Sequence, residues 1–279
     1  MKKNLFLGLM LCFCTTMVMA QTNNANVTQT GDDTTVDIIQ TGSANDVLSI
    51  VTGNGSTLGV NQTGSGNRLN SELVGNGNSA IVEQIGDANE VQQAITGDDV
   101  QSFIMSEGSQ NAVSQTITGD GNSADIIQTG DLNTVIQVQD GVSNTFSTIS
   151  TGNSNRVVSD QIGDNQEALL SQTGDNNTAV FGQNGTSNSI QAVQEGNGNS
   201  MAVSQDGQNN VAGFGDVQLT QLGDDNVMSA IQEGSANSAF GIQEGNGNNA
   251  SFDQRGESNN IISTTTGNTN VTNITQSNN

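Results

Sequence analysis

The chain of 279 residues contains 34 Gly but no Pro, His, Trp or Tyr, and hydrophobic residues make up only 32% of it. This composition argues against a compact globular domain with a wide apolar core. A formal net charge of −23 argues against nucleic acid as a partner, because phosphate backbones are bound mainly through Lys and Arg.

The first predicted element is a secretory signal peptide over residues 1–20. Lys2 and Lys3 precede an apolar run over residues 5–18, and Val18-Met19-Ala20 is typical of a cleavage site. Both cysteines lie in this segment, so the mature chain is expected to lack thiols, disulfides and the usual zinc ligands. Losing the two lysines changes the net charge from −23 to −25. No later segment is apolar enough to span a membrane.

Behind the signal, over residues 21–279, a glycine recurs every eleven residues. These glycines are Gly31, Gly42, Gly53, Gly64, Gly75, Gly86, Gly97, Gly108, Gly119, Gly130, Gly141, Gly152, Gly163, Gly174, Gly185, Gly196 and Gly207. After a five-residue insertion within residues 211–220 the phase resumes at Gly223, Gly234, Gly245, Gly256 and Gly267. So strict a period indicates one repetitive array. Each Gly-x-x segment is predicted to be a tight turn in which Gly has a positive φ.

Asn stands three residues after 18 of these 22 glycines, and Gln stands two residues before 15 of them. Asn, the next two alternate residues and Gln are spaced by two, which places them on one face of a strand. We expect these amides to form ladders inside the fold. The predicted Asn ladder comprises Asn45, Asn67, Asn89, Asn111, Asn133, Asn155, Asn177 and Asn199. The predicted Gln ladder comprises Gln40, Gln62, Gln84, Gln128, Gln172 and Gln194.

Successive eleven-residue units differ at the inward position seven residues after Gly. Up to residue 159 this position alternates between apolar residues such as Ile38 and Val60 and polar ones such as Ser49 and Ser71. The full repeat is therefore 22 residues, which predicts one strand-turn-strand-turn rung of a flattened parallel β-solenoid. About eleven rungs at ~4.8 Å would form a column of about 50 Å.

The two ends of the array lack the atypical caps that keep solenoids monomeric. Asn23, Ala25, Val27 and Gln29 form a complete strand in phase at one end, and Asn270, Thr272, Ile274 and Gln276 form another at the other end. Pro and Lys, which commonly block sheet edges, are absent after residue 20. We expect these strands to polymerise, because head-to-tail addition would continue the ladders into a filament.

The repeat resembles that of the curlins, the subunits of curli fibres, whose motif is Gln-x-Gly-x-x-Asn-x-Ala-x-x-x-Gln. The matches include Gln172-Thr173-Gly174-Asp175-Asn176-Asn177-Thr178-Ala179 with Gln183, and Gln194-Glu195-Gly196-Asn197-Gly198-Asn199. The resemblance implies amyloid-like cross-β fibres outside the cell, serving adhesion and the biofilm matrix. It also implies passage through the periplasm, a dedicated outer-membrane export channel and a related nucleating minor subunit as partners. The regularity of the array favours the major subunit over the nucleator.

Other classes of protein fit the sequence less well. A monomeric solenoid adhesin or ice-binding protein would need caps and a regular outward Thr array. A calcium-binding nonapeptide solenoid would need paired glycines, and no Gly-Gly occurs. The carboxylates, such as Asp98 and Asp175, fall in predicted turns, where we expect solvated turn formers. We therefore expect no catalytic residues, no cofactor, no metal site and no enzymatic activity.

Overall fold

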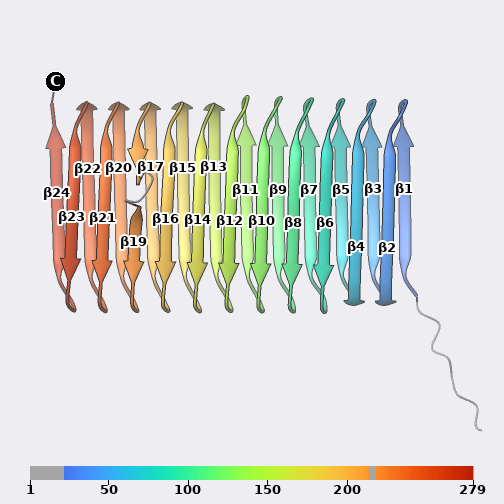
Figure 1. The fold of residues 1–279 in the computed structure, drawn as a ribbon, viewed down its shortest axis with the longest axis horizontal. Helices are drawn as coiled ribbons and strands as arrows, with labels where there is room; N and C mark the ends of the chain where they lie inside the picture. Colours follow the sequence, from blue (N-terminus) through green and yellow to red (C-terminus); the bar gives the residue numbers. More distant parts are fainter. Residues whose placement is uncertain (1–21, 214–217, 279) are drawn as a thin grey trace, which may run out of the picture.

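The structure is a computed structural model that describes residues 22–213 and 218–278. Within these ranges it contains twenty-four β-strands and no helix, so no helix that could cross a membrane. All strand pairings are parallel, and the strands form two sheets that run together along one column (Figure 1). The signal peptide predicted over residues 1–20 lies outside the described residues.

The odd-numbered strands up to β17 and the even-numbered ones from β20 onwards form sheet A. It consists of β1 (Asn24–Thr30), β3 (Asp46–Thr52), β5 (Arg68–Val74), β7 (Glu90–Thr96), β9 (Ala112–Thr118), β11 (Thr134–Asp140), β13 (Arg156–Asp164), β15 (Thr178–Thr186), β17 (Ser200–Gln208), β20 (Val227–Ser235), β22 (Asn249–Glu257) and β24 (Val271–Ser277). Sheet B consists of β2 (Thr35–Ser43), β4 (Thr57–Ser65), β6 (Ser79–Ile85), β8 (Gln101–Glu107), β10 (Ser123–Thr129), β12 (Thr145–Thr151), β14 (Glu167–Thr173), β16 (Ser189–Glu195), β18 (Val211–Ala212), β19 (Leu219–Leu222), β21 (Ser238–Glu244) and β23 (Asn260–Thr266).

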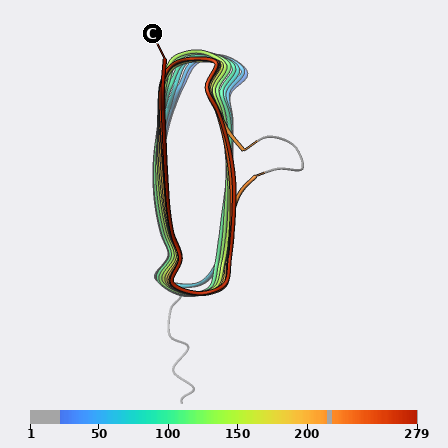
Figure 2. The ribbon, with the colours of Figure 1, turned by 90° about the vertical axis from the view of Figure 1, so that its left-hand side faces the viewer.

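Except at the insertion, the chain alternates between the two sheets, and each strand pairs with the next strand of its own sheet at a spacing of 22 residues, which becomes 27 residues across the insertion. Val47 pairs with Leu69 in sheet A, and Phe146 pairs with Ala168 in sheet B. Viewed along the column, successive rungs superpose on one narrow, flattened outline (Figure 2). The prediction of a flattened parallel β-solenoid with a 22-residue repeat and about eleven rungs is confirmed.

The insertion interrupts a single position of sheet B. Strands β18 and β19 both pair with β16 on one side and with β21 on the other. Ile190 pairs with Ala212 at the usual spacing of 22, whereas Ala192 pairs with Leu219 at a spacing of 27. The five extra residues therefore lie between Ala212 and Leu219, and the ladder resumes without a change of face.

The interior is a thin layer of apolar and amide side chains, and buried positions alternate with outward positions along the strands. In β3 the side chains of Val47, Ser49 and Val51 are fully buried, whereas Leu48 and Ile50 between them are exposed. Phe146, Phe181 and Phe252 are the largest buried side chains. This period of two follows from the pleat of a strand, and it gives each residue of the repeat a fixed face.

Candidate functional site

The turns at both corners of the rung require glycine. The 22 in-phase glycines have φ values between 100° and 153°, a region that L-residues rarely adopt. At Gly163 an added Cβ would also lie closer than 3.0 Å to the carbonyl oxygen of Gly185 in the next rung. The turns of neighbouring rungs therefore stack backbone on backbone, and only the absence of a side chain permits this approach.

The eight predicted ladder Asn residues all lie in one column at the start of the sheet A strands, and each is buried. The Oδ1 atom of Asn155 accepts a hydrogen bond from the backbone N–H of Asn177 at 3.0 Å. Its Nδ2 atom donates to the carbonyl of Gly174 at 2.7 Å and to that of Thr151 at 3.3 Å. Each Asn thus satisfies the backbone of its own turn and of neighbouring rungs.

The corresponding column of sheet B is less uniform. The four residues that replace Asn in the repeat, Thr34, Ser56, Val100 and Gln166, all fall in this column. Thr34 and Ser56 reproduce part of the pattern, because their hydroxyl groups donate to the carbonyl oxygens of Gly53 and Gly75 at 2.8 and 3.0 Å. The polar network is therefore more regular in sheet A.

The predicted Gln residues lie in sheet B, at the end of the strands. Gln40 donates to Gln62 at 2.8 Å, and Gln62 donates to Gln84 at 2.7 Å. Further along, Gln172 donates to Gln194 at 2.7 Å. Gln128 instead accepts from the hydroxyl of Ser106 at 3.2 Å. The column is therefore an amide ladder interrupted by shorter polar side chains.

Sheet A holds a second Gln ladder, which was not part of the predicted Gln ladder. In β3, β5, β7 and β9 the same position holds the apolar residues Val51, Leu73, Ile95 and Ile117. From β11 onwards it holds Gln139, Gln161, Gln183, Gln205, Gln232, Gln254 and Gln276, which form the ladder. These residues carry the signal already noted, Gln two positions before Gly. Each Nε2 from Gln139 to Gln254 also donates to a backbone carbonyl of sheet B, as Gln139 does to Ser123 at 3.0 Å. The ladder thus connects the two sheets.

The central inward position of sheet A is the least satisfied part of the described interior. Gln93 donates to Gln115 at 2.9 Å, but both polar atoms of Gln137 lack a hydrogen-bond partner. The neighbouring Ser159, whose hydroxyl also lacks a partner, is too short to reach it. An unpaired buried polar group costs about 1–3 kcal/mol. The outer Asn and Gln columns, by contrast, are largely paired.

The two ends of the column present unpaired strand edges within the described residues. Strands β1 and β2 form one end, and β23 and β24 form the other. Asn24 donates its N–H to the carbonyl of Asn45, the residue before β3, so by alternation the N–H groups of Ala25, Val27 and Gln29 point away from the column. Val27 is 40% exposed, whereas Ser49, which pairs with it in the next rung, is fully buried. The predicted end strands are therefore the outermost strands of sheet A.

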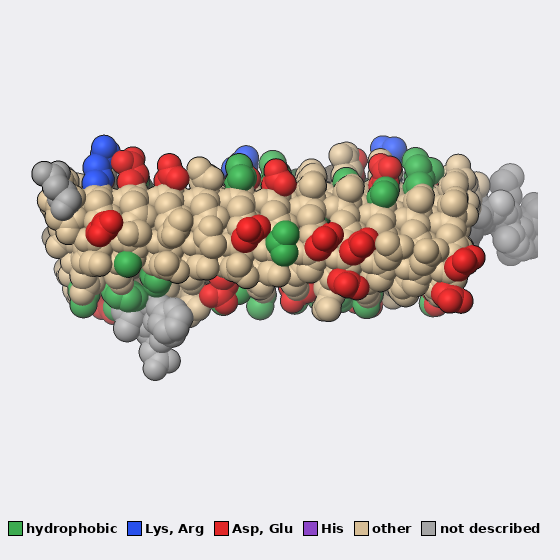
Figure 3. Space-filling view, turned by 90° about the horizontal axis from the view of Figure 1, so that it is seen from above, with side chains coloured by type: hydrophobic (Ala, Val, Ile, Leu, Met, Phe, Trp, Pro, Cys, Tyr) green, Lys and Arg blue, Asp and Glu red, His purple; other side chains and the backbone are tan. Residues whose placement is uncertain are grey.

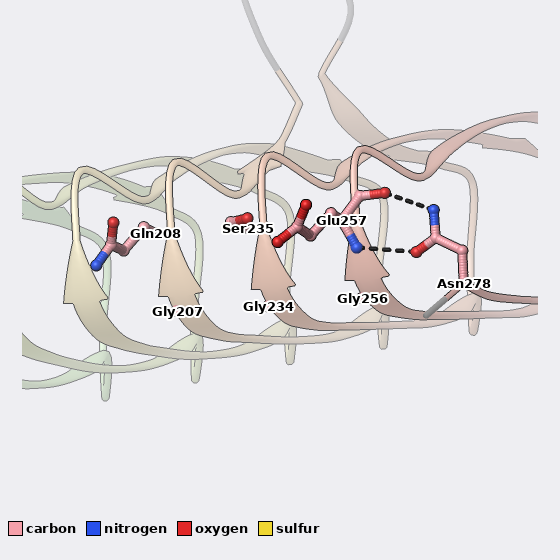
Figure 4. A pocket seen from close by; sticks show the side chains of 7 residues that line it. All are labelled: Gly207, Gln208, Gly234, Ser235, Gly256, Glu257 and Asn278. Atoms are coloured by element: carbon pink, nitrogen blue, oxygen red, sulfur yellow. Dashed lines mark hydrogen bonds between the residues drawn. The ribbon is translucent and has the colours of Figure 1, made fainter.

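The last described residue continues the corner beyond β24. The side-chain Oδ1 of Asn278 accepts from the backbone N–H of Glu257 at 2.8 Å, and its Nδ2 donates to the Glu257 carbonyl at 2.6 Å. These contacts close one end of a shallow groove along the corner glycines Gly207, Gly234 and Gly256 (Figure 4). Asn278 thus occupies the place that the turn of a further rung would take.

Acidic residues are spaced along the corner that leads from sheet B to sheet A. A hydrogen-bonded column runs through Asp131, Asn153, Asp175, Asn197, Asp224 and Asn246, in which each backbone N–H donates to the next side-chain oxygen. Acidic and neutral residues alternate in this stretch, so like charges are kept two rungs apart, about 10 Å. This alternation was not predicted, because it depends on neighbours 22 residues apart along the chain. Acidic side chains are spread along the face of the column that Figure 3 shows.

Positive charge is confined to sheet A in the described residues, at Arg68, Arg156 and Arg255. A hydrogen bond from Arg255 to Asp253 at 3.1 Å, and then the charges of Asp253 and Glu233, raise the pKa of this guanidinium. The pair is exposed to solvent, where ion pairs contribute little to stability. The net field of the surface remains strongly negative.

Comparison with protein families gives a match at two places that fit this geometry. The model described as the curlin associated repeat matches residues 31–64 and residues 167–196. The chain carries curlin associated repeats. The first segment begins in the turn at Gly31 and the second at the start of β14, and each runs through strands of both sheets over at least one rung of the column. Comparison with curated proteins gives no match. The repeat and the β-solenoid fold together support a curli-type structural subunit.

Proposed function

We propose that the chain is a secreted subunit that polymerises head to tail into extracellular, curli-like amyloid fibres of a biofilm matrix, with a role in cell adhesion. The observation that carries the proposal is that an amide ladder reaches each of the two open edges. Gln276 accepts from Gln254 at 3.3 Å at one end, and Gln40 begins the sheet B ladder at the other. The role is structural and involves no catalytic step.

The direction of the ladders favours head-to-tail addition. Along both Gln columns the Nε2 atom donates towards the β24 end and Oε1 accepts from the β1 side. One end of the column therefore offers amide donors, while the other offers amide acceptors. Joining unlike ends pairs donor with acceptor, whereas joining two like ends would oppose donor to donor or acceptor to acceptor.

The remaining parts of the proposal come from the sequence and the family. Residues 1–20 would direct secretion through the periplasm, an outer-membrane channel would export the chain, and a related minor subunit would nucleate growth. We assign this chain the role of the major subunit rather than the nucleator. The unbroken Asn column of sheet A favours that role, because a repeated, uniform edge suits repeated addition of the same subunit.

The proposal is tested by incubating residues 21–279 in purified form. We expect unbranched fibres with a meridional reflection near ~4.8 Å, the spacing of strands along the column. A protein that remains a folded, β-rich monomer at every concentration would contradict the proposal and would instead indicate a monomeric solenoid.

A double variant with proline at Val27 and Thr275 serves as the contrast in this experiment. The N–H of Val27 points away from β3. The N–H of Asn278 points towards β22, because it donates to the carbonyl of Arg255, and N–H directions alternate along a strand. The N–H of Thr275, three residues earlier, therefore points away from β22. Proline at these positions removes an outward donor at each edge without breaking an existing ladder bond. We expect a β-rich protein that does not elongate. If this variant elongates at the wild-type rate, the two edges are not the growth sites.

Charge repulsion should set the rate of assembly. Subunits with a net charge near −25 repel one another, and salt reduces the range of this repulsion from ~30 Å at 0.01 M to ~8 Å at 0.15 M. We expect the lag time in a thioflavin assay to shorten several-fold over this range of sodium chloride. A lag time independent of salt would show that another step limits assembly.

A further inference from the structure

We propose that successive subunits in the fibre are related by a half-turn about the column axis, so that sheet A of one copy continues as sheet B of the next. The inference rests on the proposed function, because it concerns how the ends of two copies meet. It follows from a feature of the described column that head-to-tail addition alone does not specify: its number of strand positions is odd.

The outermost strands β1 and β24 both belong to sheet A. Sheet A has twelve strands, and sheet B has twelve of which β18 and β19 share one position, leaving eleven. The column thus contains eleven and a half rungs. If the next copy were added without rotation, its β1 would stack on β24, but its β2 would lie two spacings from β23. One strand position of sheet B would stay vacant, with unpaired edges on both sides.

A half-turn removes the vacancy. It exchanges the two sheets and also reverses the strand direction, which is opposite in sheets A and B (Figure 1). Strand β1 of the next copy then lies parallel to β23, and its β2 lies parallel to β24. Every strand edge at the junction is paired. Inward residues meet as follows: Ile261 with Ala25, Ile274 with Ile38, and Gln276 with Gln40 of the next copy.

The amide columns favour the rotated junction. Gln276 ends the sheet A ladder, and with rotation it meets Gln40, which donates to Gln62 and thereby begins the sheet B ladder. Without rotation Gln276 would meet Gln29, whose column continues with the apolar Val51. Rotation therefore joins one amide ladder to another, whereas direct stacking extends the ladder by Gln29 alone before it meets the apolar residues that begin at Val51.

The corner at Asn278 points to the same arrangement. Beyond β24 the chain turns at the corner that leads from sheet A to sheet B, and Asn278 stacks on Gly256 and Glu257 as a turn residue does. The position that this turn leads to lies beside β23, in sheet B. The rotated copy places its β1 in that position.

Mixed single-cysteine chains distinguish the two junctions, because residues 21–279 contain no cysteine. The rotated junction places Thr275 beside Ile39 of the next copy, one strand spacing away, whereas direct stacking places it beside Thr28. All three side chains are exposed. Fibres grown from equal amounts of Thr275→Cys and Ile39→Cys chains are expected to give cross-linked dimers with a short bifunctional reagent. The mixture of Thr275→Cys and Thr28→Cys chains is expected to give none.

Control experiments distinguish failure of the cross-linking reaction, failure of the half-turn and failure of the proposed fibre. Ile127→Cys with Ile149→Cys in one chain should cross-link within the molecule, since these residues pair between β10 and β12. Dimers in the Thr28 mixture would overturn the half-turn but leave the proposed fibre intact. Dimers from Ile39→Cys chains alone would indicate like ends in contact and overturn it as well. If no fibres form, the proposed function fails and the inference fails with it.

A second readout does not depend on the junction residues. Gln218 immediately precedes β19 of sheet B, at the insertion, so a gold label on a Gln218→Cys chain marks the sheet B side of each subunit. With a half-turn the labels should alternate between opposite sides of the fibre, with about 55 Å between successive labels along the axis. Direct stacking would place all labels on one side at intervals of about 58 Å, which would overturn the inference.

Discussion

Replacing Asn177 by Asp and Gln183 by Glu is expected to stop fibre growth at neutral pH. The Nδ2 atom of Asn177 donates to the carbonyl of Gly196 at 2.8 Å, and Nε2 of Gln183 donates to Gln205 and to the Glu167 carbonyl, both at 2.9 Å. A carboxylate lacks these donors and places a buried negative charge against carbonyl oxygens. The loss of hydrogen bonds alone costs about 1–3 kcal/mol per group, and buried charge adds to it.

The matched control introduces the same two charges on the opposite face of the same strand, as Thr178→Asp with Val180→Glu. Val180 is 41% exposed and faces outward, so this variant should form fibres at a rate within a few-fold of wild type. Thioflavin kinetics and electron microscopy measure both. Equal growth of the two double variants would contradict the assignment of faces.

The inward variant should also respond to pH in a defined direction. Burial raises the pKa of a carboxyl group, because it disfavours the charged form. As the pH falls through this raised pKa, the introduced Asp and Glu become neutral and regain a donor. Growth of the inward variant should therefore recover on acidification by more than growth of the outward control. A variant that is equally inactive at every pH would indicate a steric rather than an electrostatic effect.

The second large effect is expected from Gly163→Ala. A methyl group there requires an L-residue at a φ of 111° and would lie closer than 3.0 Å to the carbonyl oxygen of Gly185. Strain of this kind costs about 1–3 kcal/mol, and separating two stacked turns adds the loss of their backbone contacts. We expect the variant to fail to assemble, or to form fibres that dissolve at a lower denaturant concentration.

Gly182→Ala provides the matched control for this prediction. Gly182 lies in β15, outside the turns, and nothing approaches within 4 Å of an added Cβ. Its φ is not in the left-handed region. Assembly rate and denaturant resistance should match wild type. If both alanine variants behave alike, the close stacking of the corner glycines does not limit the fold.

Much of the architecture could be predicted because the repeat encodes it locally. The spacing of Asn45, Val47, Ser49 and Val51 by two defines a strand face, and an in-phase glycine defines the turn on either side. The alternation of inward residues every eleven positions distinguishes the two sheets. These signals lie within a dozen residues of one another, so the sequence displays them directly.

Other features depend on neighbours 22 residues away and were not predicted. The Asn side chains were expected to bond mainly with one another, but Asn155 bonds chiefly to the backbone of Asn177, Gly174 and Thr151. An Asn side chain is short and lies against a turn whose carbonyls need partners, so backbone contacts prevail. The odd number of strand positions likewise emerges only when each strand is assigned to a sheet and the two halves of the interrupted strand are counted once.

The interrupted strand has a practical consequence for protein engineering. Ala212 and Leu219 keep the register of β18 and β19 although five extra residues separate them, so the column accepts additional chain length there without losing its ladders. Elsewhere, inserting a single residue would exchange the two faces of a strand. A foreign epitope or enzyme-recruiting peptide placed between these two residues would appear once per subunit. A fibre built from such chains would be a one-dimensional scaffold with its cargo at regular intervals.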